Sequence, residues 1–140
     1  MTLILDAAPL VALADRNDEL FKRVEDLLAN ERGGLIVPAP VAAEVDYLLD
    51  KRFGREARRG FLRDVSAGRF SVECLDILEY QLVQRLDDIY ADLNVGLADL
   101  SVVVLAHRFN TTRIATFDQR HFRTLRPVGG GAFTLHPIDG

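Results

Sequence analysis

Four acidic residues stand where an ionised side chain is costly, and their placement suggests metal-assisted chemistry. Asp6 ends a short apolar run, and Asp118 directly follows another. Glu44 and Asp99 lie in segments of helical spacing, each three or four positions from apolar residues on the same expected helix face. A carboxylate on a buried helix face lowers stability unless it is paired or bound to a metal ion.

Acidic residues gathered in one cleft imply a particular kind of cation. Like charges repel and raise one another's pKa unless a cation compensates them. A ligand set of carboxylate oxygens without His or Cys selects a hard ion, Mg²⁺ or Mn²⁺. Such an ion activates water and stabilises charge on a phosphoryl group, so the acidic set favours phosphoryl chemistry.

Each acidic position also has an ordinary structural explanation. An acid at the end of a strand is a common helix N-cap, which would account for Asp6 or Asp118 taken alone. Glu44 could be half of a buried salt bridge with one of the arginines between positions 52 and 63. Asp92 competes with Asp99 for a role in the same region. The residue types and their spacing leave these alternatives open.

A basic segment lies inside an acidic chain. The net charge is −4, yet residues 51–69 hold seven basic residues and two acidic ones, and all but two of the 17 basic residues in the chain are arginine. Arginine binds phosphate in a planar, bidentate way that lysine does not reproduce. We expect Arg55, Arg59 and Arg63 to contact RNA or a protein partner, with a solvated helix face as the third explanation. An acidic metal site with an arginine-rich flank matches phosphodiester hydrolysis.

Strand and helix patterns alternate along the chain and would position these acids. The apolar runs predict strands at 2–6, 35–37, 70–74, 113–117 and 132–135. Helical spacing and capping signals predict helices at 9–14, 18–30, 38–52, 55–66, 76–93 and 97–109. This alternation is typical of an α/β protein with a mainly parallel sheet covered on both faces. Ligands of such sheets bind outside the carboxyl ends of the strands, where Asp6 and Asp118 are expected.

Length and composition exclude several classes of protein. The chain has 140 residues, of which 49% are hydrophobic, so we expect a single domain over residues 1–140 with a substantial core. A single cysteine excludes an intramolecular disulfide, and three scattered histidines argue against structural zinc. No apolar run approaches a membrane span, and Asp6 follows the N-terminal run without a basic leader. We therefore expect a cytoplasmic protein.

Four sequence blocks resemble the PIN domain, and more narrowly the VapC-type toxins of bacterial toxin–antitoxin pairs. The blocks are Ile4-Leu5-Asp6 with Pro9–Leu13, then Pro40–Val45, Gly96–Val103 and Ile114–Phe122. The resemblance implies a Rossmann-like three-layer α/β/α sandwich and an endoribonuclease that uses Mg²⁺ or Mn²⁺. It also implies a homodimer and a cognate VapB-type antitoxin that blocks the site.

The same resemblance assigns roles to individual residues. Asp6, Glu44, Asp99 and Asp118 match the catalytic, metal-binding quartet, with Asp6 and Asp99 as its principal metal ligands. Thr116 matches a supporting polar position. His121 falls in the short motif after the last acid, where it could contact RNA or antitoxin, although a surface or turn histidine is the ordinary alternative. Ala8 replaces a frequent Ser or Thr, so one expected hydroxyl is missing.

Two other functions compete with the ribonuclease toxin. One is a PIN-like RNA- or protein-binding module that has lost catalysis, against which the presence of all four acids argues. The other is a phosphotransfer domain of the phosphatase or receiver type. A phosphatase would need a second Asp at the position of Ala8, and a receiver would need a Lys after a late strand, where neither Lys22 nor Lys51 lies.

Overall fold

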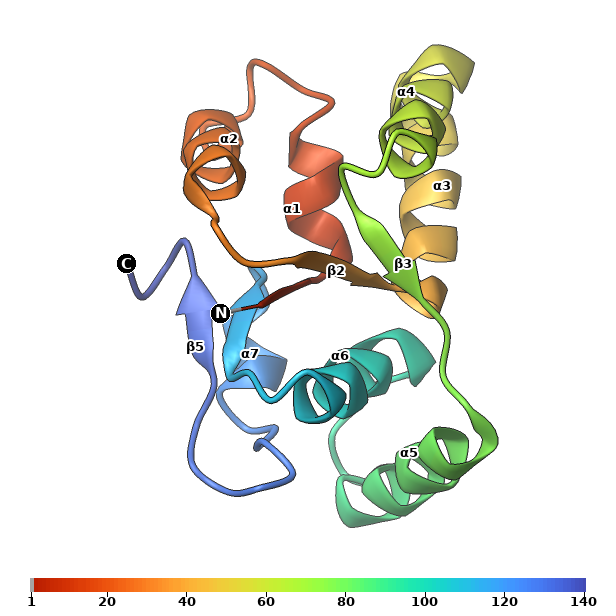
Figure 1. The fold of residues 1–140 in the computed structure, drawn as a ribbon, viewed down its shortest axis with the longest axis vertical. Coiled ribbons are helices and arrows are strands. Elements are labelled where there is room, and N and C mark those ends of the chain that lie inside the picture. Colours follow the sequence, from red (N-terminus) through yellow and green to blue (C-terminus); the bar gives the residue numbers. More distant parts are fainter. Residues whose placement is uncertain (1) are drawn as a thin grey trace.

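The computed structural model describes residues 2–140 as a sheet of five parallel strands between two layers of helices (Figure 1). The strands are β1 (Leu3–Leu5), β2 (Leu35–Pro38), β3 (Ser71–Glu73), β4 (Arg113–Ala115) and β5 (Thr134–His136). The helices are α1 (Ala7–Ala12), α2 (Phe21–Asn30), α3 (Ala39–Phe53), α4 (Arg55–Ser66), α5 (Ile77–Ile89), α6 (Leu97–Arg108) and α7 (Gln119–Phe122). The predicted α/β class with a parallel central sheet is confirmed.

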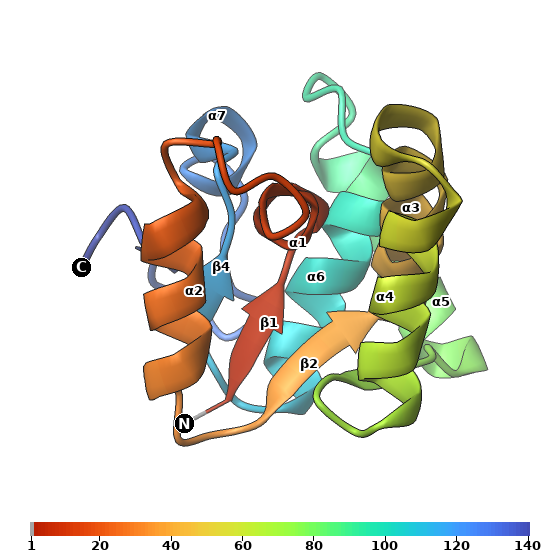
Figure 2. The ribbon, with the colours of Figure 1, turned by 90° about the horizontal axis from the view of Figure 1, so that it is seen from above.

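The strand order, β3-β2-β1-β4-β5, determines where a ligand would bind. The chain builds outward from β1 to β2 and β3, then returns to add β4 and β5 on the other side. The order therefore reverses between β1 and β4, and ligands of such sheets bind at the carboxyl edge beside this reversal. Figure 2 shows β1 and β2 pointing toward this edge, near which α7 and the segment between α5 and α6 lie.

The two helical layers bury the sheet on both faces. One face is covered by α1 to α4, and the other by α5 and α6 (Figure 1). Residues Leu100 to Ala106 of α6 are all buried, because this helix packs under β1, β2 and β4. The strand residues Leu3, Ile4, Leu5, Ile114 and Leu135 are completely buried, as expected for a sheet covered on both sides. Among residues 2–140, none of the helices is long and apolar enough to cross a bilayer.

Several predicted boundaries were wrong by a few residues. The helix predicted at 76–93 begins at Ile77 behind a capping box of Asp76 and Glu79, but it ends at Ile89. Asp87 and Asp88 lie in its last turn, where negative charge opposes the helix dipole. The helix predicted from Asp18 begins at Phe21, because the Asp18 carboxylate accepts a hydrogen bond from the Leu20 amide and forms a turn.

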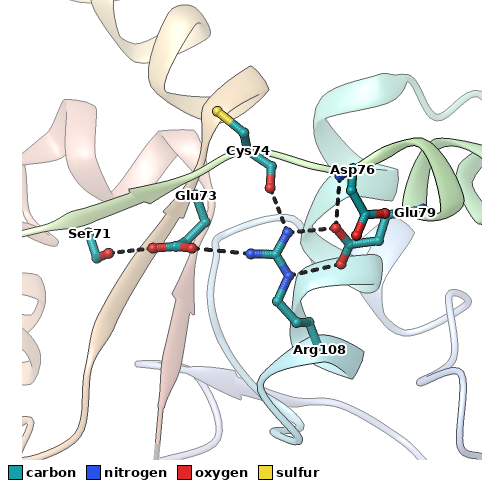
Figure 3. A network of polar contacts seen from close by, with 6 residues as sticks. All are labelled: Ser71, Glu73, Cys74, Asp76, Glu79 and Arg108. Carbon is teal, nitrogen blue, oxygen red and sulfur yellow. Dashed lines mark hydrogen bonds and ion pairs between the residues drawn. The ribbon is translucent and has the colours of Figure 1, made fainter.

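Away from the carboxyl edge at the reversal, Arg108 joins three elements in a polar network (Figure 3). Its guanidinium, at the end of α6, donates to both carboxylate oxygens of Glu79 on α5, at 2.6 and 2.9 Å. It also donates to Glu73 at the end of β3, at 3.1 Å, and to the Cys74 carbonyl. The network therefore fastens α5 to the sheet edge and to α6.

Candidate active site

The fold brings the four predicted acids to the sheet edge at the strand reversal. Asp6 directly follows β1, and Asp118 lies three residues beyond β4. Asp99 is in the first turn of α6, and Glu44 is in the second turn of α3. Burial and, after it, the charge of Asp6 raise the pKa of both Asp99 and Glu44, and the charge of Asp118 acts on Asp6, so all four belong to one neighbourhood.

Asp6 occupies the N-cap position of α1, but its side chain does not cap the helix. It is 8% exposed, and its Oδ2 accepts a hydrogen bond from the Thr116 hydroxyl at 2.7 Å. Burial raises the pKa of Asp6, while the bond from Thr116 lowers it in part. The N-cap explanation that the sequence left open is therefore wrong for Asp6.

Thr116 connects two of the acids. It is fully buried, and its hydroxyl donates to Asp6 while it accepts from the Asp118 amide at 3.0 Å. One hydroxyl thus fixes the positions of the Asp6 carboxylate and of the backbone at Asp118. The structure places Thr116 where a residue that supports the site would lie.

Asp118 begins α7, and it both caps this helix and contacts a histidine. Its Oδ1 accepts from the His121 amide at 3.0 Å, as an N-cap does. Its Oδ2 lies 2.8 Å from His121 Nδ1, which is also 3.9 Å from Oδ2 of Asp99. The N-cap explanation therefore holds for Asp118, yet the same carboxylate also faces the acidic cluster.

His121 lies closer to the acids than the ordinary explanation, a surface or turn histidine, requires. Its ring is partly buried between Asp118 and Asp99. One ligand atom from each of Asp99, Asp118 and His121 lies within 4.8 Å of the others. An imidazole nitrogen could therefore join the carboxylate oxygens in holding an ion. The spacing of three residues from Asp118 at a helix start was the available signal.

The crowding of acidic side chains also acts on the pKa of Asp99. Its side chain is 23% exposed, and burial together with the negative charge of Asp6 raises its pKa to about 6. His121 opposes this shift, and Asp118 adds to it. A carboxyl group with such a pKa lies in a site where negative charge is incompletely compensated.

Glu44 lies differently on its helix than the sequence suggested. The buried residues of α3 are Val41, Val45 and Leu49. The buried face of the helix is therefore displaced by one residue from the face on which Glu44 was expected, and that expectation was wrong. Glu44 is exposed, yet partial desolvation and the charge of Asp6 raise its pKa. Within residues 2–140, Glu44 makes no ion pair with an arginine, which removes the salt-bridge explanation.

These residues fit a divalent cation on chemical grounds. Three carboxylates with raised pKa face one edge without a lysine or arginine partner in the described part of the chain. A hard divalent ion binds such oxygens, and a single imidazole in the set is compatible with Mn²⁺ as well. Asp99, Asp118 and His121 have ligand atoms within 4.8 Å of one another, and Asp6 and Glu44 are the neighbouring acids that could complete the set.

The three predicted contact arginines lie on α4, apart from the acidic cluster. Arg55, Arg59 and Arg63 are exposed and follow one another at the four-residue spacing of one helix face. Arg59 and Arg63 both pair with Glu56, at 3.6 and 3.9 Å. None of the three contacts the acids in the described structure, and α4 packs against α3 rather than at the strand ends.

A parallel α/β sheet with acids at its strand reversal is the architecture of the PIN domain, and that family matches residues 3–126 of this chain. The chain belongs to the PIN-domain family. Within the family it is similar to the VapC-type ribonucleases. It is 36% identical to Ribonuclease VapC26 of Mycobacterium tuberculosis over 135 residues, which cover 96% of this chain and all of that protein.

Solved structures of lower sequence identity share the fold. The sarcin-ricin loop cleaving toxin VapC20 of M. tuberculosis superposes with a TM-score of 0.76 at 16% identity, over 83% of this chain and 89% of that one. The VapBC2 complex of Rickettsia felis, bound to a DNA fragment from its promoter, gives 0.68 at 19% identity, over 96% and 97%. FitAcB of Neisseria gonorrhoeae gives 0.55 at 16% identity, over 84% and 88%.

Proposed function

We propose that residues 1–140 form one PIN domain that acts as a metal-dependent endoribonuclease and as the toxin of a toxin–antitoxin pair. The observation that carries this proposal is the group of acids at the strand reversal, which are partly or fully desolvated and, among residues 2–140, lack a basic partner other than His121. Such an arrangement lowers stability in the absence of a cation. Similarity to a curated VapC ribonuclease over nearly the whole chain supports the same activity.

In the proposed reaction, each residue of the site has a separate task. A bound Mg²⁺ or Mn²⁺ would supply an activated water and stabilise negative charge on the phosphodiester. Asp6 and Asp99 are proposed as the principal ligands, with Glu44 and Asp118 completing the quartet. Thr116 holds the Asp6 carboxylate, and His121 orients Asp118 through its Nδ1. These contacts fix the ligand oxygens before substrate binds, which limits reorganisation during the reaction.

The proposed partners are RNA, a VapB-type antitoxin and a second copy of this chain. The VapBC2 structure contains the antitoxin partner of that related toxin, which supports a similar partner here. Ile77, Leu78 and Ile89 of α5 are 76%, 72% and 70% exposed, and exposed apolar residues of this size are common at protein interfaces. Action on cellular RNA implies that the protein works in the cytoplasm.

The test is cleavage of purified bacterial RNA, followed by sequencing of the new 5′ ends. We expect cleavage with Mg²⁺ or Mn²⁺, none with EDTA, and none with Asp99→Asn. The ion should also raise the melting temperature of the parent but not of Asp99→Asn, because a ligand stabilises only the state that binds it. A folded protein that binds RNA and leaves it intact under all these conditions would instead be a catalytically silent PIN module.

A further inference from the structure

A cavity of about 520 Å³ opens beside the candidate active site and is not needed to explain metal binding. Three of the elements that carry the acidic quartet also form its walls. Ala7 and Ala8 follow Asp6, Phe117 precedes Asp118, and Glu44 itself lines the cavity. Whatever occupies this cavity therefore lies next to the reacting phosphodiester in the proposed function.

The far wall comes from one face of α3. Glu44, Leu48 and Arg52 follow one another at four-residue intervals, so they lie on the same side of this helix. At 1.5 Å per residue, Arg52 lies about 12 Å along the helix from Glu44. The cavity thus runs from a proposed metal ligand to a guanidinium, and the guanidinium suits the negative charge of a phosphate.

Two aromatic rings give the cavity an apolar surface. Phe53 is the last residue of α3 and is 41% exposed, because Gly54, with a φ of 91°, turns the chain sharply into α4. Phe117, partly buried, lies on the side of the acids. An exposed aromatic side chain beside a basic residue is the arrangement that stacks unpaired nucleobases.

Two carboxylates on the third wall of the cavity favour a nucleobase over an apolar side chain as its occupant. Asp15 and Asp18 line the cavity, and each uses one oxygen for a turn, accepting from the amides of Asn17 and Leu20. In the part of the chain that the structure describes, the second oxygen of each makes no hydrogen bond. An apolar peptide side chain would leave these acceptors without a partner, whereas the exocyclic amino group of a base donates to them.

The missing hydroxyl at position 8 is consistent with this use of the space. The resemblance to VapC-type toxins leads to the expectation of Ser or Thr at this position, but Ala8 lines the cavity instead. Its methyl group adds apolar surface where a hydroxyl would add a polar atom.

We propose that this cavity is a base-binding subsite, which receives one unstacked nucleobase with an exocyclic amino group from the RNA next to the scissile bond. Phe53 stacks on the base, Asp15 or Asp18 accepts from its amino group, and Arg52 contacts the adjoining phosphate, while Phe117 forms the apolar wall toward the acids. This inference rests on the proposed ribonuclease activity and adds a determinant of its substrate choice.

The test uses a short oligoribonucleotide spanning a cleavage site that the 5′-end map identifies. Each nucleotide in turn is replaced by an abasic unit, and KM and kcat are measured for the wild-type protein. We expect one position beside the scissile bond to raise KM by roughly 5- to 150-fold, the range of a single base–aromatic stack. At that position, the analogue lacking the amino group (uridine for cytidine, inosine for guanosine, purine riboside for adenosine) should also raise KM.

The variant Phe53→Leu tests whether the sensitive base lies in this cavity. The variant keeps an apolar side chain but loses the aromatic face, and it should raise KM on the intact RNA while removing the additional effect of the abasic unit. A merely structural role for Phe53 would not remove that position-specific effect. The matched control is Tyr47→Leu, because Tyr47 is on the same helix and 61% exposed but does not line the cavity. It should behave as the wild type does.

Each other result overturns the inference in a distinct way. An abasic series without a sensitive position, or the same sensitivity in Phe53→Leu as in the wild type, excludes a base in this cavity. If Phe53→Leu cleaves RNA normally but is no longer inhibited by the antitoxin, then the cavity binds the antitoxin. If the wild-type protein cleaves no RNA with either ion, the proposed function fails first, and the base subsite fails with it.

Discussion

Two clusters of acidic residues in this protein differ in how their charge is compensated. At Arg108, the carboxylates of Glu73 and Glu79 bind one guanidinium, and hydrogen bonding from Arg108 lowers the pKa of Glu79 (Figure 3). At the strand reversal, Asp6 and Asp99 face one another's charge, and burial together with this repulsion raises the pKa of Asp99. The acids of the first cluster have a cationic partner within the chain, whereas those of the second have no lysine or arginine partner among residues 2–140.

The contrast separates a structural use of acidic residues from a functional one. At Arg108, the carboxylate of Glu79 receives two hydrogen bonds from a guanidinium of the same chain, so its charge is compensated without a ligand. Carboxylates that remain unneutralised reduce stability, and a shifted pKa in a cleft is typical of a functional site. Replacing an acid by its amide should therefore lower stability at the Arg108 cluster and raise the stability of the metal-free protein at the strand reversal.

The largest expected effect is the loss of cleavage when an acid of the second cluster is neutralised. Asp99→Asn or Asp6→Asn should reduce RNA cleavage by about 100-fold or more, because the ion of the proposed mechanism would contribute several kcal/mol to transition-state stabilisation. The matched control is Asp92→Asn, since Asp92 is an exposed acid shortly before α6. It should cleave as the parent does, and equal losses in Asp92→Asn and Asp99→Asn would contradict the assignment of Asp99.

The next effect concerns stability at the first cluster. Arg108→Met keeps much of the side-chain volume but leaves Glu73 and Glu79 without their cation, which should destabilise the protein by about 2 kcal/mol. Urea unfolding measures this change, and RNA cleavage well below the midpoint should be unaffected. Arg85→Met, at an exposed position of α5, should stay within about 0.5 kcal/mol of the parent. A stable Arg108→Met would mean that the network does not fasten α5.

The pH dependence of stability should have opposite signs at the two clusters. The pKa of Asp99 is raised from 3.8 to about 6, so its contribution is complete below about pH 4 and is lost as the pH rises through 6. Metal-free Asp99→Asn should therefore be more stable than the parent at pH 7, by on the order of 2 kcal/mol, with no difference at pH 4.

The pKa of Glu79 is lowered, so its stabilisation is present at neutral pH and is lost as the pH falls below 4.5. Glu79→Gln should consequently be less stable than the parent at pH 7, with the difference shrinking in acid. Unfolding by urea across pH 3–8, without metal, measures both variants together. Parallel pH profiles for Glu79→Gln and Asp99→Asn would remove the distinction between the clusters.

The sequence predicted the helices and strands better than it predicted the directions in which side chains point. Apolar runs indicated the five strands, because a sheet covered on both faces needs continuous burial. The helix predicted at 55–66 has the same bounds in the structure. The four residues of α7 are too few to show a helical period, however, and the position of His121 beside Asp118 depends on that turn.

Glu44 and the cavity show a second limit of sequence analysis. A single-residue difference in the rotation of α3 decides whether Glu44 faces the core or its margin, and apolar spacing alone does not resolve it. Phe53 and Phe117 line one cavity although 63 residues lie between them in the sequence, and only the fold brings α3 and the segment after β4 to that cavity. The role of the α4 arginines was left open for a similar reason, since exposure alone does not identify a partner.

The smallest expected effect tests those arginines, which are separate from both acidic clusters. If the exposed face of α4 binds RNA phosphates, Arg55→Gln with Arg59→Gln should flatten the dependence of log Kd on log salt by roughly 0.7 for each phosphate that is no longer neutralised. The control is Arg58→Gln, because Arg58 is partly buried and already pairs with Asp46 and Asp50, so its charge is largely compensated within the chain. Filter binding in the Asp99→Asn background avoids cleavage during the measurement. An unchanged salt slope with loss of antitoxin binding would assign this face to the protein partner, and α4 would then serve inhibition rather than RNA binding.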